Sequence, residues 1–144
     1  MIRVKILLLL FYLGIVWSVD AQDTLDLRYQ RYNKSINLAK ALSDLQANTV
    51  NKEMALVLQP VSLANSVFEK NFSSANSTFY QSVDFRNVRF LGKTEQSFNE
   101  FWQQVDFSNA AFDSTFAMSF TKFRGNVSFQ ESSFNGSKNL FSNK

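Results

Sequence analysis

The chain repeats itself every 22 residues from about residue 57 onward. Four series of apolar residues carry this period, and three of them consist mainly of phenylalanine. The series are Phe79, Phe101 and Phe123; Leu63, Phe85, Phe107 and Phe129; Phe68, Phe90, Phe112 and Phe134; and Val61, Val83, Val105 and Val127. A spacing that persists across unlike intervening residues is typical of a stacked solenoid, in which each repeat packs on its neighbours, and not of a mixed globular core.

Within each repeat, the apolar positions alternate as they do in a short strand. The run Val83-Asp84-Phe85-Arg86-Asn87 reads small apolar, polar, large apolar, polar, polar, and Val105-Asp106-Phe107-Ser108-Asn109 reads the same way. Because residues two apart on a strand share a face, the Val and the Phe are expected to point inward and their polar neighbours outward. Five residues then cover one side of a coil and its corner.

This pattern resembles the pentapeptide-repeat family, whose chains wind into a right-handed four-sided β-helix with Leu or Phe at the centre of each side. The resemblance covers residues 57–144 and implies an all-β solenoid, a right-handed quadrilateral β-helix of about four coils. The coils here are longer than the family's, as if two of the four sides carried an extra residue. The predicted core residues are Leu63, Phe68, Phe79, Phe85, Phe90, Phe101, Phe107, Phe112, Phe123, Phe129 and Phe134.

One side of each coil lacks a clear inward residue. The spacing places Ser74, Gln96, Met118 and Leu140 there, and most of these are not large apolar side chains. Two other registers compete with this one. Either Phe98 and Phe120 turn inward two residues later, or Phe72 and Phe116 do so two residues earlier, and the pattern leaves the choice open.

The N-terminal segment predicts a signal peptide. Arg3 and Lys5 precede an apolar stretch, Ile6 to Val19, of 14 residues, which is too short to span a bilayer comfortably. Because Val19 and Ala21 offer small residues at the two positions that a signal peptidase reads, we expect cleavage after Ala21 and a signal peptide over 1–21. The mature chain is then secreted or periplasmic, without a stable membrane anchor; an uncleaved anchor is the alternative.

Between the signal peptide and the repeats, residues 22–56 predict an amphipathic helical cap. Apolar residues at steps of three and four over 23–47 give one broad apolar face. They are Leu25, Tyr29, Tyr32, Ile36 and Ala39, with Leu38, Leu42 and Leu45 on an adjoining stripe. Such a helix is expected to cover the first coil; the alternative is a helix that binds a partner or another copy.

The last repeat, residues 123–144, has no comparable cap. An exposed coil end presents unpaired backbone groups and invites pairing with another chain. We therefore expect either a homodimer through the C-terminal coil or a longer protein of which this chain is a piece.

Composition excludes the common catalytic and metal sites. The sequence has no His and no Cys, which removes the usual soft metal ligands, the Cys nucleophile and the commonest general base. Asp84 and Asp106 align on consecutive coils, but on a convex outer face and not in a cleft. We therefore expect no catalytic residue, no bound metal, no cofactor and no enzymatic activity.

The charge balance argues against a nucleic-acid partner. Residues 57–144 carry eight Lys or Arg against seven Asp or Glu. They therefore provide neither the basic stripe that binds nucleic acid nor the acidic rod with which some pentapeptide-repeat proteins mimic DNA.

An aromatic series is the best candidate for a functional surface. Tyr80 and Trp102 each follow an inward Phe, so both are predicted to face outward, and Arg124 continues the series. These side chains either bind a sugar, a peptide or a protein, or they only stabilise the solenoid, with Arg124 over Trp102. The sequence thus predicts an exported, non-catalytic structural or protein–protein interaction module with an unknown protein partner. A carbohydrate or cell-surface ligand-binding module is the alternative.

Overall fold

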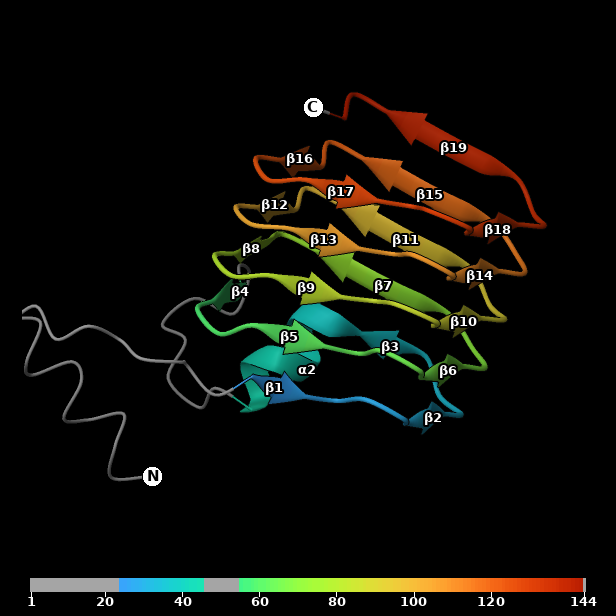
Figure 1. Cartoon of the computed structure of the whole chain (residues 1–144), viewed down its shortest axis with the longest axis horizontal. Helices are drawn as coiled ribbons and strands as arrows, with labels where there is room; N and C mark the ends of the chain where they lie inside the picture. The colour runs from blue at the N-terminus through green and yellow to red at the C-terminus, as the bar shows by residue number, and fades with distance from the viewer. Residues whose placement is uncertain (1–23, 46–54, 144) are drawn as a thin grey trace, which may run out of the picture.

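A computed structural model describes residues 24–45 and 55–143 of the chain. These residues form a parallel β-solenoid with four sheets as its sides (Figure 1). The all-β solenoid fold expected from the 22-residue period is therefore confirmed. The predicted signal peptide and its cleavage position at Ala21 lie outside the described residues.

Each turn of the solenoid adds one short strand to each sheet. Sheet A contains β1 (Leu25–Asp26), β5 (Val61–Ser62), β9 (Val83–Asp84), β13 (Val105–Asp106) and β17 (Val127–Ser128). Sheet B contains β2 (Arg31–Tyr32), β6 (Val67–Phe68), β10 (Arg89–Phe90), β14 (Ala111–Phe112) and β18 (Ser133–Phe134). Sheet C contains β3 (Ile36–Asn37), β7 (Phe72–Ala75), β11 (Thr94–Ser97), β15 (Phe116–Ser119) and β19 (Lys138–Phe141). Sheet D contains β4 (Ala55–Val57), β8 (Ser77–Phe79), β12 (Glu100–Phe101) and β16 (Lys122–Phe123).

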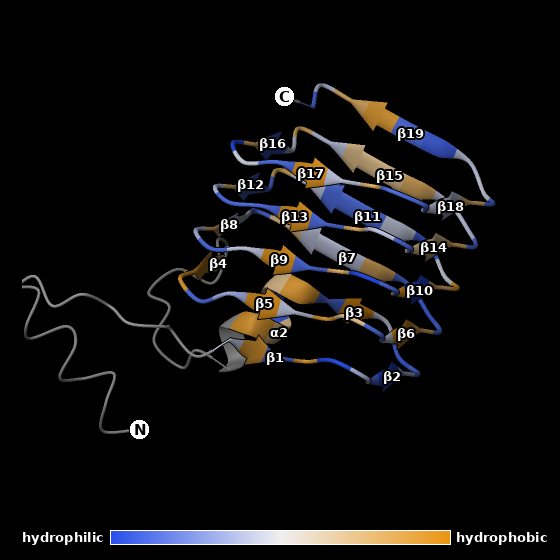
Figure 2. Cartoon of the chain, in the orientation of Figure 1, coloured by the Kyte–Doolittle hydropathy of each residue, from blue (hydrophilic) through white to orange (hydrophobic). Residues whose placement is uncertain are grey.

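Four coils follow from this order. Coil 1 runs from β4 to β7, coil 2 from β8 to β11, coil 3 from β12 to β15 and coil 4 from β16 to β19. Their strands pair in register, so that Val61 lies beside Val83 and Val83 beside Val105. The valines of sheet A consequently form a hydrophobic column along β5, β9, β13 and β17 (Figure 2).

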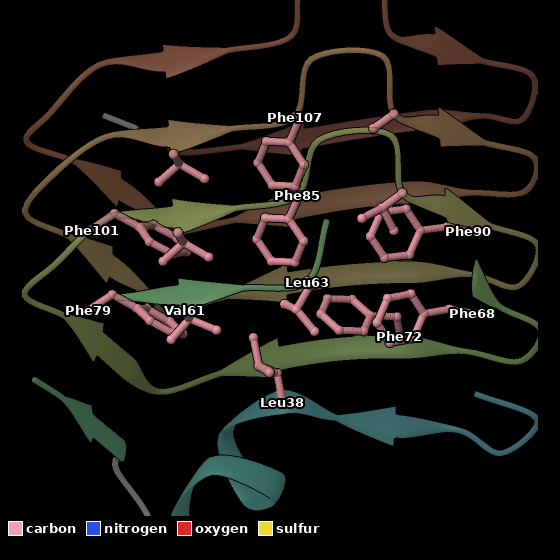
Figure 3. Packing of buried hydrophobic residues seen from close by; sticks show 14 of the residues in the cluster. Leu38, Val61, Leu63, Phe68, Phe72, Phe79, Phe85, Phe90, Phe101 and Phe107 are labelled. Carbon is pink, nitrogen blue, oxygen red and sulfur yellow. The ribbon is translucent and has the colours of Figure 1, made fainter. Parts of the chain in front are cut away.

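Stacked phenylalanine rings fill the interior. The Phe85 and Phe107 rings lie 4.7 Å apart and almost parallel, and Phe79 and Phe101 stack at 4.8 Å (Figure 3). This spacing matches the distance between hydrogen-bonded strands, which is why one ring per coil can stack on the next. Leu63, Phe68, Phe79, Phe85, Phe90, Phe101, Phe107 and Phe112 are buried, and Phe123, Phe129 and Phe134 of coil 4 are partly buried.

Sheet C decides the register that the sequence left open. Phe72 and Phe116 point inward and are buried, as are Ser74, Gln96 and Met118 two residues further along each strand. Phe98 and Phe120 are exposed instead. Leu140 shares the inward register, but it lies in the last described coil, and 61% of it is exposed.

The predicted helix over 23–47 is wrong for most of its length. Residues 25–37 form β1, β2 and β3, an incomplete coil beneath coil 1. Leu25 pairs with Val61, and Tyr32 stacks on Phe68 with ring centroids 4.7 Å apart. Strand pairing wins here because each strand gains backbone hydrogen bonds to coil 1, such as that from the Leu25 N–H to the Pro60 carbonyl at 2.8 Å.

Within the described residues, the helical segment is α2 (Leu38–Leu45), and it closes the lower end of the core. It packs against β7 and β4, with Leu38 and Leu42 buried. Leu38 lies below Leu63 in Figure 3. Asn37 caps the helix by accepting a hydrogen bond from the Lys40 N–H at 3.1 Å. No helix within residues 24–45 or 55–143 is long and apolar enough to cross a membrane.

Candidate interaction surface

The outer face of sheet D collects exposed apolar side chains. They lie on its strands or within two residues of them, and each is more than a third exposed. The residues are Leu56, Leu58, Tyr80, Phe98, Trp102 and Phe120. A group of this kind on one face of a soluble protein indicates a contact surface, whereas single exposed apolar residues need no explanation.

Tyr80 and Trp102 lie on this face because each follows an inward residue, Phe79 or Phe101. Their rings stack at 5.7 Å with an interplanar angle of 23°. Arg124 continues the column, with Cζ 4.3 Å from the Trp102 ring centroid. Glu100 orients Arg124 through an ion pair to its Nε at 2.5 Å. The structure therefore brings the three predicted surface residues together.

This stacking determines what the column can bind. Tyr80 covers one face of the Trp102 ring and the Arg124 guanidinium lies over it as well, yet 41% of Trp102 remains exposed. The ring edges are thus the accessible parts. A sugar that stacks on an aromatic ring needs an open face, whereas an aromatic edge, which carries partial positive charge, suits carbonyl oxygens and other rings.

A second aromatic column lies at the corner between sheets C and D. Its four positions are Asn76, Phe98, Phe120 and Ser142, and all have positive φ, between 47° and 52°. The Phe98 and Phe120 rings stack at 4.9 Å, and 59% and 53% of these residues are exposed. The sequence analysis did not identify this surface. Asn76 was the available signal, because Asn favours left-handed backbone and marks the position as a corner.

The aligned carboxylates of sheet A each bind a residue two positions further along the chain. Asp84 binds Arg86 through an ion pair at 2.8 Å, and Asp106 accepts a hydrogen bond from the Ser108 N–H at 2.8 Å. Partial burial raises the pKa of Asp84, but the hydrogen bonds from Arg86 outweigh this and hold the pKa below its ordinary value. Among the residues that the structure describes, no group of three or more His, Cys, Asp or Glu could hold a metal ion.

These carboxylates predict acid sensitivity. The side-chain hydrogen bond from Arg28 lowers the pKa of Asp26 to about 2, and Arg89 lowers that of Asp113. A carboxyl group with a lowered folded-state pKa stabilises the fold above its unfolded pKa of about 3.9, and this stability is lost as the pH falls through the folded value. Because the sequence also has no His, the thermal midpoint should be flat near neutrality and fall between about pH 4 and pH 2.

Thermal unfolding followed by circular dichroism from pH 7 to pH 2 checks this expectation. Asp84→Asn serves as the matched variant, because it keeps the shape of the side chain and removes its charge. The variant should lose less of its midpoint on acidification than the parent. A midpoint that rises on acidification would contradict the assignment of these ion pairs as stabilising.

No family model matches the chain, and no curated protein or solved structure matches it either.

Proposed function

We propose that the chain is an exported, non-catalytic repeat protein of the pentapeptide-repeat type that works as a protein–protein interaction module. The column Tyr80–Trp102–Arg124 is the observation that carries this proposal. It is exposed, it lies on a rigid solenoid, and it changes along its length from aromatic to cationic. Tyr, Trp and Arg are also the residues most enriched among those that dominate protein interfaces.

A protein partner fits this column better than a carbohydrate does. The covered faces of Trp102 leave little room for a stacked sugar ring. Leu58 holds the next position below Tyr80 in the same column and adds an exposed aliphatic side chain. Aliphatic surface, aromatic edges and one guanidinium together suit an apolar segment of a protein that ends in an acidic group.

The proposed export requires a fold that is stable without disulfides, because the sequence has no Cys. The apolar stretch Ile6 to Val19 supports a signal peptide and therefore a secreted or periplasmic location. Exported proteins of this size often use disulfides, but the sequence has no Cys. Stacked Phe rings and the ladder of parallel strands supply the stability in their place.

The upper surface of coil 4 is a separate place for self-association. Leu140 and Phe141 of β19 are exposed there, and Val127 of β17 is exposed beside them. In the part of the chain that the structure describes, strands β16 to β19 each pair with a neighbour on one side. Pairing of two copies through this C-terminal coil would cover both the apolar side chains and the strand edges.

Changing Tyr80 and Trp102 to Ser together should abolish partner binding at unchanged fold. The purified parent and variant are immobilised, and proteins retained from the exported fraction of the producing cells are quantified by mass spectrometry. Retained proteins are then purified and their affinities measured directly. We expect at least a tenfold loss of affinity, because removing a central aromatic anchor costs about 2 kcal/mol or more.

Tyr29→Ser is the matched control, because Tyr29 is an exposed aromatic residue away from sheet D. Circular dichroism and urea unfolding establish that the folds are equal. Equal affinity of the parent and the double variant would refute the role of this column. Retention by immobilised polysaccharides that is lost in the double variant would favour the carbohydrate alternative instead.

A further inference from the structure

Phe98 and Phe120 are unfavourable residues at the positions that they occupy. Their φ angles, 52° and 50°, lie in the left-handed region, which favours Gly and Asn over bulky side chains. More than half of each residue is also exposed. Strained backbone and exposed apolar surface thus coincide at two successive positions of one column, and such coincidences are typical of functional sites.

The solenoid itself does not require these two rings. Asn76 holds the same corner one coil lower with nearly the same backbone, at φ 50°. The interior beside the corner is already filled by the buried side chains of Gln96, Asn99 and Met118. The Phe98 and Phe120 rings stack on each other outside the core. Within residues 24–45 and 55–143, no ring of the core stacks on Phe98 or Phe120.

Over its described positions, the column has the same order of polar and apolar residues in both directions along the solenoid axis. It runs Asn76, Phe98, Phe120, Ser142, so the apolar pair lies at the middle and a polar residue at each end. A two-fold axis perpendicular to the solenoid and passing between the two rings would place Phe98 of one copy opposite Phe120 of another. Two-fold interfaces require this kind of self-complementary surface, and an apolar centre with a polar rim is the usual anatomy of a protein interface.

The neighbouring face of sheet C offers a flat bed for the opposing rings. Next to the column lie small, partly buried residues, Ala75, Ser97 and Ser119. Glu95 is the acidic residue on this face, and Lys93 neutralises it through an ion pair at 2.6 Å. Two copies can therefore approach through this face without repulsion between like charges.

From these observations we infer that Phe98 and Phe120 form the centre of a two-fold contact between two copies of this chain, packed side by side in opposite directions. This contact uses other residues than the Tyr80 column proposed above for a protein partner. The Tyr80 column runs from apolar to cationic, from Leu58 to Arg124, and so lacks the symmetry that a contact between identical copies needs.

The contact is small, so the dimer should be weak. The face of sheet C is roughly 19 Å tall and 13 Å wide at ordinary strand spacings. With the two rings it offers on the order of 450 Å² per copy, a little over half of the roughly 800 Å² per partner that a standard interface buries. We therefore expect a dimer that dissociates in the micromolar range and is absent at high dilution.

Sedimentation velocity of the purified exported protein over a range of concentrations tests the inference. The test variant changes both Phe98 and Phe120 to Asn, which the chain itself uses at this corner in Asn76, so folding should be retained. We expect the parent to dimerise and the variant to have a dissociation constant at least tenfold higher. The variant Tyr80→Ser with Trp102→Ser and the variant Val127→Ser with Leu140→Ser should both dimerise like the parent.

Cysteine crosslinking tests the geometry. Because the sequence has no native Cys, the introduced Cys residues supply the thiols that react. A mixture of the Phe98→Cys and Phe120→Cys proteins should form disulfide-linked dimers faster than either protein alone, because each residue faces the other one across the two-fold axis. A parent that stays monomeric at every concentration would overturn the inference. So would dimerisation that is lost only in the Val127 and Leu140 variant, which would assign the contact to the coil 4 end.

Discussion

Replacing Phe90 by Ala is expected to lower the free energy of unfolding by about 3 to 5 kcal/mol, the range measured for large buried aromatic residues. Phe90 is fully buried in the middle of its column, where its ring stacks on Phe68 at 5.2 Å and on Phe112 at 5.0 Å. Phe72 packs against it from the side at 5.2 Å. The gap left by Ala would be walled on several sides by rings tied to their own coils, so it cannot collapse easily.

Phe134→Ala is the matched control for this prediction, because Phe134 belongs to the same column one coil above Phe112. Its ring stacks on Phe112 at 4.7 Å, but it lies in the last described coil and is only partly buried. We expect a loss of about 1 to 2 kcal/mol, because part of the ring is in water already. Urea unfolding followed by circular dichroism measures both variants. Equal losses would show that burial within the stack does not set the stability.

Much of the solenoid could be predicted from the sequence because its core is periodic. In-register strands convert a fixed spacing into columns, so the identity of each inward position is repeated in every coil. Val61, Val83 and Val105 illustrate this: each lies beside the next, as the 22-residue spacing requires. Tyr80 and Trp102 were predictable for the same reason, because the side chain that follows an inward Phe on a strand points outward.

The incomplete lower coil was missed because a different interval separates it from coil 1. Its spacing was nevertheless in the sequence. Leu25, Leu27, Tyr32 and Ile36 are separated as Val61, Leu63, Phe68 and Phe72 are, with an offset of 36 residues in place of 22. Leu25, Tyr32 and Ile36 also form, together with Tyr29, a series at steps of four and three, which satisfies a helix. Helix α2, which follows β3 directly, accounts for part of the longer interval.

Sheet C was ambiguous because one Phe serves two coils. The Phe72 ring contacts Phe85 and Phe90 of coil 2 as well as Phe68 of its own coil. Thr94, which pairs with Phe72 one coil higher, can therefore be small. Phe116 repeats the arrangement by contacting Phe129 and Phe134 of coil 4. A search for one large apolar residue per coil cannot detect a column that fills its space with one residue in every second coil.

Asn99 is a polar residue that also connects neighbouring coils. It is buried, and it reaches down to the corner below, where its Oδ1 accepts a hydrogen bond from the Ser77 N–H at 3.2 Å. Its Nδ2 donates to the Ser74 carbonyl and to Gln96 Oε1, both at 2.9 Å. The positive φ at Asn76 interrupts the regular ladder at this corner, and one amide side chain thus satisfies both a backbone donor and a backbone acceptor there.

Replacing Asn99 by Ala should therefore cost about 2 to 4 kcal/mol of unfolding free energy, because each buried group left without a partner costs about 1 to 3 kcal/mol. Asn143→Ala is the matched control. Asn143 follows β19, two coils above Asn99, and makes the same pair of bonds to the Thr121 N–H and the Met118 carbonyl, both at 3.1 Å. It is only partly buried, so water can replace it, and its loss should stay below about 1 kcal/mol. If Asn99→Ala proved as mild as Asn143→Ala under urea unfolding, the corner would have to be stabilised by its strands alone.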